Sequence, residues 1–345
     1  TSALSREGTF VAGNLVLVSL AFAVLFGTVV PIVSRLFGPG ITVQAPYFER
    51  VSAPLFVLML LLMAAGLALP WRPQLHETAG RLPQWVARLL PGVATAALFG
   101  ALLAVGGLHR PTLLVGFAAA FAAGAVALGE LVRLVRARHG RALSGPGGSW
   151  SRVGGLLAHG GVAVLAVAVL ASTAIPVETS RSLAIGQGVH LGGYTVRYEG
   201  LASRRVPGAT EVYARVSLLR GERLVARLEP ARRLYDGNMA QFGATTEVAL
   251  YRHLEGDVYV ALAGWEEGGR RAAFELYVNP LVNWIWVGAV LMLLGTALAA
   301  GSRAEVRLLQ HRAEARILEE ARRLARYRVA SSAGRLDAPA TPGGR

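Results

Sequence analysis

Residues 156–170 read LLAHGGVAVLAVAVL and form the centre of an almost wholly apolar run from Val153 to Ile175. A run of this length can cross a lipid bilayer as one helix. His159 is its only ionisable side chain, and hydrocarbon favours the uncharged imidazole because the charged form would lose its hydration. A neutral imidazole is also the form that binds a metal or a haem iron. The run therefore predicts a membrane span that carries a functional histidine.

The neighbours of His159 are small. On a helix, Gly155, His159 and Ala163 share one face, which predicts room for a flat group beside the imidazole. The alternative is structural: His159 would hydrogen-bond a neighbouring helix across a close interface of small residues. Ionisable side chains within membrane spans are usually functional, which favours the first interpretation.

The composition predicts an integral membrane protein. Of the 345 residues, 53% are hydrophobic, and the mean hydropathy is +0.46. The formal net charge is +14, but the arginines lie mainly beside the apolar runs and in the tail, which is typical of membrane proteins and argues against nucleic-acid binding. The chain has no cysteine and no lysine, which excludes thiolate chemistry, iron–sulfur clusters, Walker-type phosphate loops and lysine Schiff bases.

The apolar runs predict a polytopic α-helical membrane protein with about six transmembrane helices. The expected spans are residues 10–36, 51–69, 92–108, 112–134, 153–175 and 281–299. The connections 70–91 and 133–152 are rich in arginine, so we expect them on the cytoplasmic side. The loops 37–50 and 109–111, and the region after residue 175, then lie outside.

Residues 176–278 have a different pattern, because apolar and polar side chains alternate. Examples are Tyr194–Tyr198, Val212–Val216, Val248–Tyr251 and Val258–Leu262. The alternation predicts about seven short strands in an extracytoplasmic all-β domain, a small sandwich or barrel tethered at both ends by helices.

The predicted domains are a five-span helical membrane region (1–175), the β domain (176–278), the last transmembrane helix (279–301) and a basic cytoplasmic tail (302–345). Residues 303–329 of this tail predict an amphipathic helix, either on the anionic inner leaflet or in solvent, and the end predicts disorder. Because the chain begins with Thr1, without a recognisable signal peptide, we expect the polypeptide to continue upstream.

The other histidines are poor partners for His159. A membrane haem commonly takes two axial histidines, one on each face of the ring. His109, beside Arg110 at the outer membrane edge, is the nearest second candidate, although a turn-capping pair is the favoured interpretation. The remaining histidines are His76 and His139 in the inner loops, His190 and His253 on the strand-domain surface, and His311 in the tail. If His159 binds iron, we therefore expect its opposite ligand to be missing from these residues, which agrees with a polypeptide that continues upstream of residue 1.

The sequence assigns no catalytic residue. Glu7, Glu49 and Glu130 lie at the ends of predicted spans, where solvated or helix-end roles are expected. No paired carboxylates, Ser-His-Asp arrangement or zinc-ligand spacing occurs, so hydrolytic and metalloprotease chemistry are not indicated.

Several short motifs follow one another along the chain. They are Ser5–Gly8, Gly27–Pro31, Pro46–Phe48, His159–Ala163, Gly193–Val196, Thr245–Ala249, Asp257–Val260 and Asn279–Trp286. With these motifs in this order, the sequence resembles the C-terminal part of the CcmF family. CcmF is the large membrane component of a cytochrome c haem lyase. The resemblance extends from Thr1 to Arg303. Asn14 departs from it, because the family often has paired asparagines there.

The resemblance implies that His159 is one of two transmembrane histidines that bind the iron of a resident b-type haem, haem b. It implies a lyase that takes haem from a CcmE-like haem chaperone and attaches it by thioether bonds to the Cys-x-x-Cys-His motif of apocytochrome c. A CcmH-like apocytochrome-binding subunit and quinol are further implied partners. The thiols belong to the substrate, so such a lyase needs no cysteine of its own.

The resemblance also implies a place in the bacterial inner membrane, with the β domain on the periplasmic side. Two other functions stay open on the residues alone. One is a small-molecule transporter or permease, which predicts broken helices and several polar residues at mid-membrane depth. The other is a non-catalytic membrane scaffold whose outer domain recruits partners.

Overall fold

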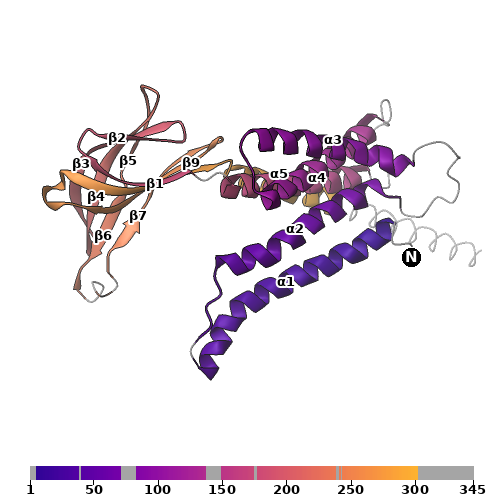
Figure 1. The fold of residues 1–345 in the computed structure, drawn as a ribbon, viewed down its shortest axis with the longest axis horizontal. Coiled ribbons are helices and arrows are strands. Elements are labelled where there is room, and N and C mark those ends of the chain that lie inside the picture. The colour runs from indigo at the N-terminus through magenta and orange to yellow at the C-terminus, as the bar shows by residue number, and fades with distance from the viewer. Residues whose placement is uncertain are drawn as a thin grey trace, which may run out of the picture.

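The computed structural model describes residues 5–38, 40–70, 83–136, 149–174, 177–237, 241 and 243–301. Figure 1 shows a helical region at one end and a β domain at the other. The labelled helices are α1 (Arg6–Phe37), α2 (Ala45–Ala68), α3 (Gln84–Val105), α4 (Pro111–Arg136) and α5 (Ser149–Ala174). The helix Trp284–Gly301, which we call the last helix, comes after the β domain. Within the described part of the chain, these six helices are long and apolar enough to cross a membrane.

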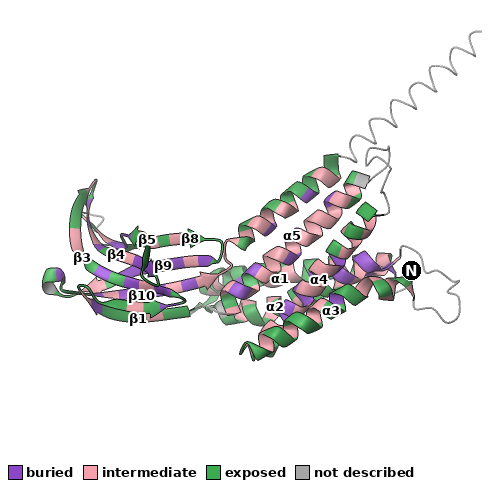
Figure 2. Ribbon diagram, turned by 90° about the horizontal axis from the view of Figure 1, so that it is seen from above, coloured by how far each residue is buried: buried purple, intermediate pink, exposed green. Residues whose placement is uncertain are grey.

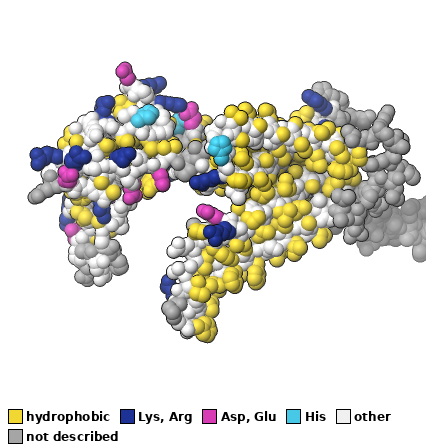
Figure 3. All heavy atoms as spheres, in the orientation of Figure 1, with side chains coloured by type: hydrophobic (Ala, Val, Ile, Leu, Met, Phe, Trp, Pro, Cys, Tyr) yellow, Lys and Arg dark blue, Asp and Glu magenta, His cyan; other side chains and the backbone are white. Residues whose placement is uncertain are grey.

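The prediction of a multi-pass membrane protein with six spans is confirmed. Apolar side chains cover the helical region in Figure 3, whereas charged side chains gather over the β domain and near the helix ends. The predicted tail, residues 302–345, and the histidines at 76, 139 and 311 lie outside the described residues.

The first helix begins earlier than its apolar run predicts. α1 starts at Arg6 instead of near residue 10, because the Ser5 hydroxyl accepts a hydrogen bond from the Gly8 amide at 3.2 Å. This contact is an N-cap, which satisfies one of the amide groups that a helix start leaves without a partner. The residues from Arg6 to the predicted start of the span near residue 10 are thus already helical.

The third helix also begins earlier, at Gln84 instead of near residue 92. Arg88 therefore lies on α3 and not in a loop, and its Nε atom is 3.8 Å from the Glu130 Oε1 atom of α4. Glu130 is only 14% exposed, so of the two expected roles, solvated or helix-end, the solvated one was wrong. The ion pair allows both charges to lie between helices.

α4 forms the centre of the helical region. It contacts α2, α3 and α5, and its buried residues show as purple segments in Figure 2. The α2–α4 contact is built from small and aliphatic side chains, namely Leu60, Ala64, Leu67 and Ala68 of α2 with Ala119, Ala120, Ala123, Val126 and Ala127 of α4. Alanines let helix backbones approach closely, which is how helices associate in a solvent as apolar as themselves.

The last helix packs against α5 through glycines on both sides. A Cβ atom built on Gly161 of α5 would lie 2.7 Å from the Gly288 carbonyl oxygen. A Cβ atom on Gly154 would lie 2.5 Å from the Gly295 carbonyl oxygen. Both glycine pairs repeat after seven residues, so they lie along one side of each helix.

The β domain is a sandwich of two antiparallel sheets, which decides between the two predicted forms. One sheet has the order β1–β10–β9–β8, and the other has β2–β3–β4–β6–β7 with β5 also paired to β4. The strands are β1 (Val177–Ala184), β2 (Gly188–Leu191), β3 (Tyr194–Val206), β4 (Ala209–Arg220), β5 (Arg223–Leu228), β6 (Ala231–Tyr235), β7 (Thr245–Glu247), β8 (Ala249–His253), β9 (Gly256–Trp265) and β10 (Arg271–Pro280).

The prediction of about seven strands was too low, because the described residues form ten. β2 and β7 have only 4 and 3 residues, and alternation is not recognisable over so few. The core between the sheets contains Tyr198 and Phe274, each no more than 1% exposed. The Tyr198 hydroxyl is satisfied there, since it donates to the Gly269 carbonyl oxygen at 2.7 Å.

An ion-pair network lies on the sheet that contains β3, β4 and β6. Glu211 of β4 is buried and accepts hydrogen bonds from Arg204 of β3 and Arg233 of β6. Burial raises the pKa of Glu211, but the hydrogen bonds and charges of Arg233 and Arg204 outweigh it, so the net pKa lies below its usual value. The Glu211 carboxylate therefore stays ionised inside the domain.

The turn between β8 and β9 is bonded to the start of the last helix. The Asn283 amide donates to the His253 carbonyl oxygen at 2.9 Å and to the Asp257 carboxylate at 2.5 Å. The Trp284 indole donates to the Leu254 carbonyl oxygen at 3.0 Å. These bonds attach the β domain to the beginning of the last helix.

Candidate functional site

His159 is the eleventh of the 26 residues of α5, and its imidazole is held by its own helix. The ring is half-buried, and its Nδ1 atom lies 2.5 Å from the Gly155 carbonyl oxygen, one turn earlier. A carbonyl oxygen can only accept, so Nδ1 carries the proton and donates it. Nε2 is then left with a lone pair, and no described residue forms a hydrogen bond with it.

The two small neighbours of His159 have different surroundings. A Cβ atom on Gly155 would meet no atom within 4 Å, so space is open on that side. Ala163 is buried, and a Cβ atom on Gly124 of α4 would lie 3.2 Å from its methyl group. The room that the sequence predicts on this face is therefore on the Gly155 side, while α4 closes the Ala163 side.

None of the other described histidines lies beside His159. His109 lies exposed in the turn between α3 and α4. His190 and His253 are exposed on β2 and β8, as the sequence predicts. Among the described residues, no group of three or more His, Cys, Asp and Glu side chains could hold a metal ion. His159 can therefore contribute one axial ligand to a haem, but the described residues do not complete the pair.

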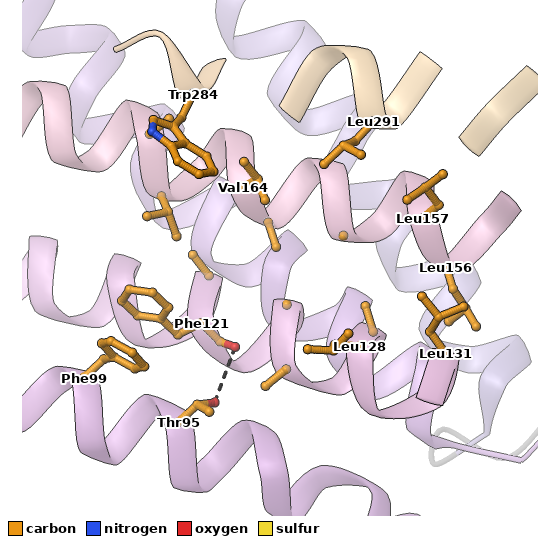
Figure 4. A pocket seen from close by; sticks show the side chains of 18 of the residues that line it. Thr95, Phe99, Phe121, Leu128, Leu131, Leu156, Leu157, Val164, Trp284 and Leu291 are labelled. Atoms are coloured by element: carbon orange, nitrogen blue, oxygen red, sulfur yellow. Dashed lines mark hydrogen bonds between the residues drawn. The ribbon is translucent and has the colours of Figure 1, made fainter. Parts of the chain in front are cut away.

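An apolar cavity lies on a neighbouring side of α5. It measures about 590 Å³ and is lined by residues of α3, α4, α5 and the last helix. Figure 4 shows Trp284 near one end and Leu131 and Leu156 near the other. Gly160 lines this cavity but His159 does not.

Sequence reasoning did not find this cavity, because it depends on how the helices cross. The Phe99 and Phe121 rings of α3 and α4 stack at 4.3 Å beside it. The Thr95 hydroxyl is 3.4 Å from the Phe121 carbonyl oxygen and adds a polar group to its wall. No spacing of residues along the chain signals such a contact.

Six apolar spans, a β-sandwich inserted before the last of them and one histidine inside the fifth define a polytopic membrane protein with a built-in extramembrane domain. Residues 174–280 match the family model described as the CcmF C-terminal beta-sandwich. The fold is similar to the solved structure of a cytochrome c heme lyase CcmF, with a TM-score of 0.66 and 26% identity over 87% of this chain and 46% of that one.

Curated relatives agree with this match. The chain is 33% identical over 305 residues to the cytochrome c-type biogenesis protein ccl1 of Rhodobacter capsulatus, covering 88% of this chain and 45% of that protein. It is 31% identical over 303 residues to CcmF of Pseudomonas aeruginosa, covering 87% and 44%. Residues 174–280 thus match the CcmF C-terminal beta-sandwich, and 87–88% of the chain is similar to part of CcmF-type cytochrome c biogenesis proteins, as the resemblance predicts. The chain spans somewhat less than half the length of these relatives.

Proposed function

We propose that this chain forms part of a cytochrome c haem lyase and that His159 is one axial ligand of a resident b-type haem. One observation carries the proposal: His159 has a fixed tautomer, with Nδ1 bonded to the Gly155 carbonyl oxygen and Nε2 left with its lone pair. Iron-binding histidines commonly use this arrangement, because the second hydrogen bond orients the ring and raises its basicity.

The surroundings of His159 suit a flat, apolar group. The space beside Gly155 lies on the same helix face as the imidazole, and the packed side chains of α4 keep water from the opposite side. When bound, the haem supplies one-electron chemistry to the attachment reaction. The residues of this chain hold the ring, orient Nε2 and exclude solvent.

The other components of the reaction come from partners. We assign the second haem ligand to protein outside the described residues, because none of them brings another histidine to the bilayer interior. Apocytochrome c, a CcmE-like haem chaperone and a CcmH-like subunit are the partners that the family implies. The apolar cavity between α3 and α5 suits the isoprenoid tail of a quinol, since its lining is almost entirely hydrocarbon.

The placement of charge supports an orientation in the inner membrane. Arg88, Arg133 and Arg136 lie at the end of the helices opposite the β domain. Arginines gather on the cytoplasmic side of membrane proteins, which puts the β domain on the periplasmic side. Apocytochrome and chaperone would then meet the chain on that side.

The helices argue against a transporter. α1, α2 and α3 contain Pro31, Pro54 and Pro91, but each remains a continuous helix. A transporter site is typically built from helices that are interrupted at the middle of the membrane.

Visible spectroscopy of the purified full chain tests the proposal. The chain is titrated with haemin in detergent, with imidazole added to supply the missing ligand. We expect a Soret band that is lost in His159→Ala and kept in the matched variant His109→Ala, with equal amounts of both variants in the membrane. If His159→Ala binds haem with the wild-type spectrum and affinity, the proposal is wrong.

Gly155→Leu gives an independent test of the same site. It leaves the His159 ring in place but fills the open space beside it, so we expect the Soret band to be weakened. Gly13→Leu on α1 is the control, because a Cβ atom there also meets no atom within 4 Å. Equal haem binding by both leucine variants would show that the haem does not lie beside Gly155.

A further inference from the structure

Arginines from four helices converge at the end of the helical region that lies farthest from the β domain. They are Arg6 of α1, Arg88 of α3, Arg133 of α4 and Arg152 of α5. Together with Glu130 of α4 we call them the inner arginine cluster. No residue of the proposed haem site belongs to this cluster, so the role of the cluster does not depend on the proposed function.

Glu130 is the only carboxylate in the inner arginine cluster, and its ion pairs with Arg133 and Arg88 share one of its oxygens. The Glu130 Oε1 atom accepts from the Arg133 Nη2 atom at 2.8 Å and lies 3.8 Å from the Arg88 Nε atom. Arg6 is within electrostatic reach of Arg152, Glu130 and Arg88. Glu7 is next to Arg6 in the chain but is exposed to solvent. Among the described residues, one negative charge thus faces the positive charges of both Arg88 and Arg133.

This imbalance is costly where the side chains are withdrawn from water. Arg88 and Arg133 are 38% and 41% exposed, so their mutual repulsion is screened less than on an open surface. The Nε atom of Arg133 is buried and finds no acceptor among the described residues. A buried donor without an acceptor is destabilising, and an anion bound beside Arg133 would supply the acceptor.

The position of the cluster indicates what that anion is. Both neighbouring helices present apolar side chains to the lipid there, with Leu90 of α3 53% exposed and Val135 of α4 50% exposed. The arginines therefore lie at the depth of phospholipid headgroups, where a helix passes from hydrocarbon to water. Guanidinium groups form paired hydrogen bonds with phosphate oxygens, and basic sites between transmembrane helices on the cytoplasmic side bind anionic lipids.

We propose that the inner arginine cluster is a binding site for a phosphate group, carried by an anionic phospholipid of the adjoining leaflet. Arg88, Arg133 and Arg152 supply the hydrogen-bond donors, and Glu130 holds Arg88 and Arg133 through its ion pairs. The bound phosphate offsets the excess positive charge and joins α3, α4 and α5 at their ends. Phosphatidylglycerol and cardiolipin have the required charge, whereas zwitterionic phosphatidylcholine does not.

Native mass spectrometry of the full chain in detergent tests this site. Equal amounts of phosphatidylglycerol and phosphatidylcholine are added, and the retained lipid is counted for each protein. The double variant Arg88→Gln/Arg133→Gln removes two donors, and Arg35→Gln/Arg110→Gln removes two exposed arginines at the opposite helix ends as a matched control. At about 1 kcal/mol per arginine near an anionic membrane surface, the first should lower phosphatidylglycerol retention about 30-fold. The control should change it less than twofold.

Two further variants keep the proposal falsifiable if the glutamine variant folds poorly. Arg88→Lys/Arg133→Lys preserves the charge and should retain most of the lipid. Glu130→Gln removes the competing carboxylate and should raise retention about fivefold. A purely structural cluster predicts the opposite for Glu130→Gln, namely a less stable chain that retains no additional lipid.

Competition with inorganic phosphate distinguishes a phospholipid headgroup from free phosphate as the ligand of the cluster. If millimolar phosphate does not displace phosphatidylglycerol, the ligand is the lipid. If phosphate displaces the lipid and protects the chain against heat to the same extent, the cluster is a site for free phosphate. Equal retention of both lipids by the wild type, or unchanged retention in Arg88→Gln/Arg133→Gln, overturns the proposal.

Discussion

Replacing Gly161 of α5 by alanine should separate α5 from the last helix, whereas the same change at its neighbour Gly160 should not. A Cβ atom on Gly161 would lie 2.7 Å from both the Gly288 carbonyl oxygen and the Met292 amide nitrogen. These are backbone atoms, which cannot rotate out of the way. A Cβ atom on Gly160 would meet no atom within 4 Å.

The magnitude is set by these distances. Ordinary van der Waals contact begins at 3.4 Å, so the two helices must move apart by about 0.7 Å to accept the Gly161→Ala methyl group. Overpacking of this kind costs about 1–3 kcal/mol. Both variants gain up to about 1 kcal/mol of helix propensity, and this gain cancels in the comparison. The two variants should therefore differ by the overpacking cost alone, about 1–3 kcal/mol in the free energy of unfolding.

Unfolding of the full chain in mixed micelles, with increasing amounts of a denaturing detergent, measures this difference. Tryptophan fluorescence reports it, because Trp284 and Trp286 lie at the start of the last helix. On the proposed function, Gly161→Ala should also weaken haem binding while His159 remains in place, because His159 is two residues away. If Gly161→Ala and Gly160→Ala are equally stable, the helix backbones are not in contact at Gly161 and the packing argument fails.

Two predictions concern the β domain. Because the pKa of Glu211 is depressed, its stabilising effect is present at neutral pH and is lost as the pH falls below about 4.5. Glu211→Gln should therefore lower the stability at pH 7 and flatten the loss of stability in acid. Denaturation curves of Glu211→Gln that match the wild type from pH 7 to 3 would contradict this. Asn283→Ala removes two hydrogen bonds to the β8–β9 turn, at about 1 kcal/mol each. The rate of amide hydrogen exchange at His253 and Leu254 should then rise severalfold, while the rate in the remote strand β3 should not change. If the turn is equally protected in the wild type and in Asn283→Ala, Asn283 does not hold the turn.

The sequence allowed the layers of this fold to be predicted because each layer has its own periodicity. Long apolar runs locate the six spans, and alternation over residues such as Val258–Leu262 locates the central strands of the sandwich. Short strands such as β7 were missed, since they are defined by their partners across the sheet and not by their own pattern. The early start of α3 was missed for a related reason, because the charge of Arg88 is stabilised by Glu130 on another helix.

The candidate site was predictable only in part. A lone histidine in an apolar run is visible in the sequence, and so is the small residue one turn before it. Which side of His159 is open depends on α4, whose Gly124 meets Ala163 on the closed side. No local pattern contains that contact, because the two residues are brought together by the crossing of two helices.

The placement of the sandwich between α5 and the last helix links the β domain to His159 by two routes. α5 contacts β10 directly. The second route runs from the β8–β9 turn through Asn283 to the last helix, and from Gly288 of that helix to Gly161 of α5. The first step of this route uses the side-chain amide of Asn283, and the second is a contact between helix backbones. A β domain tethered by one strand alone could swing without moving α5. Because the β domain is held at both ends, we expect a tilt of the domain to shift the last helix, against which the span of His159 is packed.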